Sequence, residues 1–124
     1  MMRILAATIG ALAVCYLTSV AAAADITGTW TAAFDTQIGV QKYTYTFQVK
    51  GSELTGTAAS EIATTVIKNG KVDGDTVTFL ESLDFMGMLL DISYTGKIVS
   101  ADQIDFTRQV ADVATETLVA RRAK

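Results

Sequence analysis

The sequence predicts an all-β protein: an antiparallel up-and-down barrel of about eight strands that follows a cleaved signal peptide. Apolar and polar residues alternate with a period of two, the connections between the alternating runs are short, and proline is absent from the 124 residues. No helical spacing of apolar residues recurs after the N-terminal segment. About 100 residues then remain for a single domain, and closure into a barrel removes the exposed sheet edges that promote aggregation.

Residues 1–24 have the organisation of a signal peptide. Arg3 supplies a positive charge, an apolar run covers residues 4–20, and four alanines end at Ala24. The apolar run is slightly shorter than the roughly 20 residues of a membrane-spanning helix. We therefore expect cleavage after Ala24, export to the periplasm or the medium, no stable membrane insertion afterwards, and one mature domain over residues 25–124.

The stretch "LAVC" offers an alternative fate for the N-terminus. It is similar to a bacterial lipobox, in which a cysteine is acylated and becomes the first residue, here Cys15. Val14 stands where such boxes usually have glycine, alanine or serine, so a lipoprotein is the minority interpretation.

Composition excludes several classes of function. Without Arg3 the chain has nine basic residues against 13 acidic ones, a net charge of −4, which argues against a nucleic-acid partner. Histidine is absent, so histidine metal sites and histidine-based catalysis are excluded. No phosphate loop, dinucleotide fingerprint, nucleophile elbow or metal-ligand spacing occurs, and we expect neither a cofactor nor a metal.

The clearest strand is "QKYTYTFQV", residues 41–49, where aromatic and polar residues alternate as in a half-buried strand. The dipeptide Asp73-Gly74 suits a type I′ hairpin turn. The same alternation predicts seven further strands, which cover residues 26–34, 53–60, 64–72, 75–83, 88–99, 102–110 and 115–122.

An up-and-down path sorts the connections between the two ends of the barrel. The turns at one end are tight and polar, whereas those at the other end are longer and apolar, which marks that end as the mouth. These apolar residues either admit a small hydrophobic or aromatic molecule, form a partner surface, or fold inward and cap the core. They are Ile38, Val40, Ile62, Phe85, Met86, Met88 and Val113.

Two charged residues occupy inward-facing positions of their strands. Glu81 shares its parity with Phe79, Arg108 shares its parity with Phe106, and Tyr45 and Tyr94 also point inward. Buried opposite charges pair with each other or hold a polar ligand group. The functional interpretation is a ligand pocket of Tyr45, Glu81, Phe85, Met88, Tyr94 and Arg108.

In this pocket Arg108 would anchor a carboxylate or phenolate, with Glu81 as its counter-charge. Glu81 is also the candidate general acid or base if the barrel is an enzyme. The alternative is that both charges reach water at the mouth, or that a bulge reverses their direction.

The first and last strands of a closed meander run side by side. Trp30 then lies near Arg121 and Arg122, and a guanidinium over the indole would plug the closed end. Gly28-x-Trp30 on the first strand with an arginine on the last resembles lipocalins and related calycin barrels. The run "GTW … LTGT … GKVDGDTVTF … YTGKI … ATETLVARR" resembles short, mostly uncharacterised bacterial secreted domains of this lipocalin-like type.

The resemblance implies an eight-stranded barrel with an arginine packed on the tryptophan at its base. The chain is shorter than typical lipocalins and lacks their C-terminal helix and disulfide. The leading hypothesis is a non-catalytic exported protein that binds a small hydrophobic or aromatic molecule at its open end. The alternatives are an isomerase, lyase or hydrolase that uses Glu81 and tyrosines, and a module that docks a protein or the envelope through its apolar rim.

Overall fold

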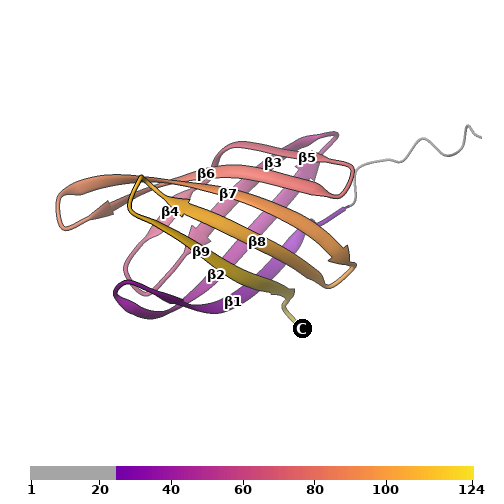
Figure 1. The fold of residues 1–124 in the computed structure, drawn as a ribbon. Coiled ribbons are helices and arrows are strands. Elements are labelled where there is room, and N and C mark those ends of the chain that lie inside the picture. Colours follow the sequence, from indigo (N-terminus) through magenta and orange to yellow (C-terminus); the bar gives the residue numbers. More distant parts are fainter. Residues whose placement is uncertain (1–24) are drawn as a thin grey trace, which may run out of the picture.

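The computed structural model describes residues 25–124 as strands joined by short turns (Figure 1). The expected signal peptide over residues 1–24 and the alternative acylation of Cys15 lie outside the described residues. The strands are β1 (Gly28–Thr36), β2 (Gly39–Lys50), β3 (Glu53–Ala59), β4 (Thr64–Val66), β5 (Lys68–Asp73), β6 (Thr76–Phe85), β7 (Met88–Ser100), β8 (Gln103–Val110) and β9 (Ala114–Arg122).

The strands form a closed antiparallel barrel whose order follows the sequence. β2 pairs with both β1 and β3, and β1 pairs with β9, so the sheet closes on itself. Eight strands make the ring, and the short β4 pairs with β3 beside it. The predicted all-β barrel of about eight strands is therefore confirmed.

The strand predicted over residues 64–72 is divided in two at Ile67. β4 pairs with the end of β3, whereas β5 pairs with its beginning. Between them Ile67 is buried, and its amide donates to the carbonyl of Gly56 over 3.0 Å. The pairing of β5 with β6 contains a register shift near Asn69, which has a φ of 53°. Such irregularities typically bend the strand that carries them.

Aromatic side chains fill the interior beside the closed end. On β2 the alternation buries Tyr45 and Phe47, while the intervening threonines are exposed. Phe79 and Tyr94 stack with their ring centroids 4.3 Å apart, and Phe106 meets both rings edge-on. Offset and edge-to-face pairs add to the free energy of apolar burial, which makes this half of the barrel a packed core.

Trp30 and Arg122 close the base of the barrel. The two are register partners of β1 and β9, and the guanidinium lies 4.6 Å from the centroid of the indole rings. The indole Nε1 donates to the carbonyl of Ile26 over 2.9 Å. Arg121 is exposed on the outer face of β9. Of the two candidate arginines, Arg122 is thus the one that covers the tryptophan.

Gly28 precedes Trp30 for a steric reason. Its φ is +137°, and a Cβ atom at this position would lie 3.0 Å from Nη1 of Arg122. That same Nη1 donates to the carbonyl of Thr27 over 2.9 Å. Residues with side chains rarely adopt such a φ, so the Gly-x-Trp spacing lets the arginine reach across the start of the strand.

Two hairpin turns differ from each other in backbone conformation. Gly74 and Asp75 are the central residues of the β5–β6 turn, and only Gly74 of the two has a positive φ, 62°. This is the pattern of a type II′ turn, so the expected type I′ turn is wrong. In the β6–β7 turn both Met86 and Gly87 have positive φ, 56° and 82°, as a type I′ turn requires.

Candidate functional site

Polar side chains from several strands meet inside the open half of the barrel. Glu81 on β6 is 0% exposed and Arg108 on β8 is 4% exposed. Tyr45 on β2 and Tyr94 on β7 are buried with them. The inward direction of all four follows from the period-two alternation of their strands.

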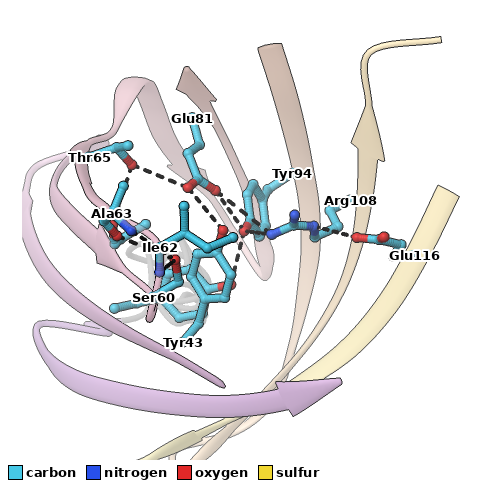
Figure 2. Close-up of polar contacts among 11 residues, drawn as sticks. Tyr43, Ser60, Ile62, Ala63, Thr65, Glu81, Tyr94, Arg108 and Glu116 are labelled. Atoms are coloured by element: carbon cyan, nitrogen blue, oxygen red, sulfur yellow. Dashed lines mark hydrogen bonds and ion pairs between the residues drawn. The ribbon is translucent and has the colours of Figure 1, made fainter. Parts of the chain in front are cut away.

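Glu81 accepts hydrogen bonds from three hydroxyl groups (Figure 2). Its Oε2 lies 3.1 Å from Tyr43 Oη and 3.3 Å from Thr65 Oγ1. Its Oε1 lies 3.0 Å from Tyr94 Oη. An ionised carboxylate is purely an acceptor, so three donors satisfy much of its hydrogen-bonding capacity without water.

Arg108 lies between two carboxylates. Its Nε donates to Glu116 Oε1 over 2.7 Å, and its Nη1 is 3.8 Å from Glu81 Oε1. The same Nη1 donates to Tyr94 Oη over 2.6 Å, which links the arginine to Glu81 through a hydroxyl. The two ion pairs compensate the charge of the buried guanidinium, as burial requires.

Aromatic rings hold the guanidinium of Arg108 in place. Its Cζ lies 5.0 Å from the ring centroid of Phe34 and 5.1 Å from that of Tyr43. The hydroxyls of Tyr45 and Tyr94 are 3.0 Å apart and continue the network toward the core. Cation–π contacts of this kind favour the charged arginine in a water-poor environment.

Burial shifts the titration of this network. It raises the pKa of Glu81, and the charge of Arg108 and the hydroxyls of Tyr94 and Tyr43 only partly oppose the increase. Burial also raises the pKa of Tyr94 and of Tyr45. Both tyrosines therefore stay protonated and act as hydroxyl donors near neutral pH.

A cavity of about 130 Å³ lies beside the network at the open end. Tyr43, Arg108 and Glu116 form part of its wall, and Ile62, Leu83 and Ile92 supply apolar surface. In another protein an engineered apolar cavity of about 150 Å³ binds benzene. The cavity therefore has the size of one small ring.

Gln41 also lines this cavity and carries an unpaired acceptor. Its side chain is buried, and its Oε1 has no hydrogen-bond partner among the residues that the structure describes. The amide Nε2 donates to the carbonyl of Val40 over 3.4 Å. The oxygen is thus a polar group without a partner on a residue that lines an otherwise largely apolar cavity.

The structure brings four of the six residues of the predicted pocket together. Tyr45, Glu81, Tyr94 and Arg108 belong to one hydrogen-bonded network. Of these four, Arg108 also lines the cavity, whereas Glu81 does not. Whether these residues bind a ligand stays a prediction.

The other two predicted pocket residues lie in the β6–β7 hairpin, which projects at the left of Figure 1. Met88 is 64% exposed and does not line the cavity. Phe85 is the last residue of β6, and its side chain is not among the described ones. A loop tip with apolar composition therefore does not by itself identify a cavity wall.

The pocket predicted from the sequence did not include Gln41, Tyr43, Thr65 and Glu116. Gln41 and Tyr43 share the parity of Tyr45, and Glu116 shares that of the buried Leu118. The alternation used to find Glu81 also places these three residues inward. Thr65 lies beside the bend at Ile67, which the sequence does not predict.

The rim of the open end exposes apolar side chains. Of the predicted mouth residues, Met86 is 89% exposed, and Ile38, Val40, Ile62, Met88 and Val113 are exposed as well. They come from the connections that join β1 to β2, β3 to β4, β6 to β7 and β8 to β9, or from the adjoining strand ends. The alternative in which the predicted mouth residues fold inward and cap the core does not describe these six.

The seam between β1 and β9 is paired only near the closed end. The two strands pair at Trp30↔Arg122 and Thr31↔Arg121, whereas β1 pairs with β2 along its whole length. A shallow hollow of about 1220 Å³ follows this flank, and Ala33 and Val119 are among the residues along it. It reaches Tyr43 and Glu116, which also line the small cavity.

Within residues 25–124, no three Cys, Asp or Glu side chains gather in a way that would hold a metal ion. The described chain also contains no helix with the length and apolarity needed to cross a membrane.

No protein-family model matches the sequence, and no curated protein matches it. A similar solved structure is that of EF1p2_mFAP2b bound to DFHBI, with a TM-score of 0.53 and 12% identity. The alignment covers 79% of this chain and 94% of that chain. At this identity the likeness concerns the fold alone, which the two proteins share as a barrel.

Proposed function

We propose that the protein is an exported binding protein that holds one compact, mostly apolar small molecule at the open end of its barrel, without transforming it. The observation that carries the proposal is the cavity of about 130 Å³, with Ile62, Leu83 and Ile92 in its wall. Concave sites with apolar walls and a few polar groups are typical of small-molecule sites. The exposed apolar rim around the mouth is consistent with entry of such a molecule.

The structural neighbour supports this use of the fold. EF1p2_mFAP2b was solved with DFHBI bound, so a barrel of similar architecture accommodates a ligand. The resemblance of the sequence to lipocalin-like secreted domains points to the same use and to export. Because one fold hosts many functions, the argument rests on the cavity itself.

The arrangement of Glu81 favours binding over catalysis. The carboxylate does not line the cavity, and its oxygens accept hydrogen bonds from Tyr43, Thr65 and Tyr94. A general base must reach the proton that it abstracts, directly or through one water. The network therefore serves to hold Arg108 and Tyr43 in the cavity wall.

Titration of the isotopically labelled protein with toluene, followed by NMR, tests the proposal. Toluene has the size of the cavity and no polar group, so it reports on the apolar walls alone. We expect saturable shifts at the amides of Ile92 and Val110, which line the cavity, and none at Val72 near the closed end.

Two neighbouring substitutions on β9 give a matched pair. Ala114 lines the cavity, whereas Thr115 is exposed and points to the other face of the strand. Ala114→Phe should abolish the toluene shifts by filling the cavity, and Thr115→Phe should leave them unchanged. Absence of saturable shifts in the unsubstituted protein would show that the cavity is not a binding site.

A second candidate function is docking of the rim onto a partner protein, which the exposure of Met86, Met88 and Leu89 favours. Acidic side chains lie near this rim, so the fitting partner surface is apolar and basic; they are Asp35, Glu61, Asp84, Asp91 and Asp112. A Met86→Ser/Met88→Ser double variant should lose capture of such a partner and retain toluene binding. If the double variant keeps both partner capture and toluene binding, this candidate function is wrong.

A further inference from the structure

We infer that the cavity takes an uncharged ligand that donates one hydrogen bond, from an O–H or N–H group on a compact apolar body, to Oε1 of Gln41. The inference rests on the proposed function and specifies the chemistry of the ligand. It follows from the one buried polar side-chain atom in the described residues that lacks a hydrogen-bond partner.

Gln41 is positioned as an acceptor. Its side chain is 9% exposed, and its inward direction follows from the alternation along β2. The amide nitrogen donates to the carbonyl of Val40, which leaves the oxygen as the group without a partner. An unpaired buried acceptor is costly because burial removes its hydrogen bonds to water and supplies none in return.

The rest of the cavity wall explains why a single donor on an apolar body fits. Ile62, Leu83 and Ile92 offer no hydrogen bonds, so most of the ligand must be apolar. Two nitrogens of Arg108 in the same wall already donate, Nε to Glu116 and Nη1 to Tyr94. Gln41 Oε1 is the fully buried acceptor of this wall that has no partner in the described part of the chain, so a ligand donor there would complete its hydrogen bonding.

The charges around the cavity favour an uncharged ligand. Arg108 already lies within 4 Å of two carboxylates, Glu116 at 2.7 Å and Glu81 at 3.8 Å. An anion at Arg108 would meet both negative charges, which differs from the sequence-based expectation of a bound carboxylate or phenolate. A cation would lose its hydration at a largely apolar wall.

Phenol and toluene form a matched pair of probes because they differ by a hydroxyl in place of a methyl group. We expect the unsubstituted protein to bind phenol at least as tightly as toluene. The side-chain NH₂ resonances of Gln41 should shift when phenol binds and stay in place when toluene binds. These measurements need no variant, so they test the hydrogen bond to Gln41 even if a substitution at that position prevents folding.

Gln41→Met removes the acceptor with little change in volume, and Gln48→Met is the control. Gln48 lies on the same strand, is exposed and does not line the cavity. Gln41→Met should raise the ratio of the phenol to the toluene dissociation constant about tenfold, the usual scale of one buried hydrogen bond. Gln48→Met should leave this ratio unchanged.

The outcomes separate this inference from the proposed function. If toluene binds but phenol binds more weakly, or if Gln41→Met leaves the ratio unchanged, the assigned hydrogen bond is wrong while the cavity remains a binding site. If neither probe binds the unsubstituted protein, both proposals are overturned. Tighter phenol binding that Gln41→Met removes and Gln48→Met preserves supports the inference.

Discussion

The guanidinium of Arg108 and the carboxylate of Glu81 lie 3.8 Å apart inside the barrel, and the hydroxyl of Tyr94 joins them by two hydrogen bonds. Glu116 holds the other side of the guanidinium. The pair thus belongs to a connected polar network rather than to an isolated salt bridge. In such a network the loss of one member leaves the others buried without partners.

Replacement of Arg108 by methionine should lower the free energy of unfolding by about 3–5 kcal/mol, the usual cost of leaving a buried charge without its partner. Glu81 and Glu116 would then face each other without the positive charge between them. Urea denaturation measures the change. Arg121→Met is the control, because Arg121 is exposed and should change stability by less than about 0.5 kcal/mol. Equal effects of the two substitutions would contradict the role given to the network.

The contribution of Glu81 to the free energy of unfolding should decrease as the pH rises above the ordinary pKa of a glutamate. Burial raises the pKa of Glu81 in the folded state above the ordinary value of about 4.5 that it has in the unfolded state, so between these values the folded state binds more protons than the unfolded state. Stability from this group is complete below pH 4.5 and declines as pH rises through the folded-state pKa. The groups that face it are Arg108, Tyr43, Tyr94 and Thr65.

The measurement is the difference in unfolding free energy between the unsubstituted protein and Glu81→Gln, taken from pH 4 upward. The subtraction removes the titration of the surface carboxylates, which both proteins share. We expect the advantage of the unsubstituted protein to decrease with increasing pH. A difference that is constant or increases would show that the pKa of Glu81 is not raised.

Period-two alternation predicted the barrel and the inward direction of Glu81 and Arg108, because that direction depends only on the position of a residue within its strand. It did not predict the bend at Ile67, which depends on how β3 divides its pairing between β4 and β5. The arrangement of Arg108 between two carboxylates was also missed. Which inward-facing residues meet depends on strand register, and no local sequence pattern determines that register here.

The contact between Arg122 and Trp30 should stabilise the closed end by about 1–2 kcal/mol, the scale of a partly desolvated cation–π contact. Arg122→Gln should lower the thermal midpoint accordingly, whereas Arg121→Gln, at the next position, should have little effect. Gly28→Ala should also destabilise, because its φ of +137° is unfavourable for alanine and its Cβ would crowd Arg122. If Arg122→Gln and Arg121→Gln shift the thermal midpoint equally, the contact of Arg122 with Trp30 does not stabilise the closed end.

The partly paired seam between β1 and β9 should exchange its amide hydrogens faster than the rest of the barrel. The amide of Ala123 donates to the carbonyl of Thr29, so by antiparallel alternation the N–H groups of Ala33 and Val119 point into the seam. Pairing between the two strands stops at Thr31↔Arg121, and these two amides lie beyond it.

Hydrogen exchange followed by NMR at each amide checks this expectation. Ala33 should exchange much faster than Ala32, whose N–H points toward β2 by the same alternation. Val119 should likewise exchange faster than Leu118, which points toward β8. Equal protection of neighbouring residues would mean that β1 and β9 pair along their whole length in solution. Alternating protection would instead show that the barrel opens most readily along this flank, beside Tyr43 and Glu116 of the cavity wall.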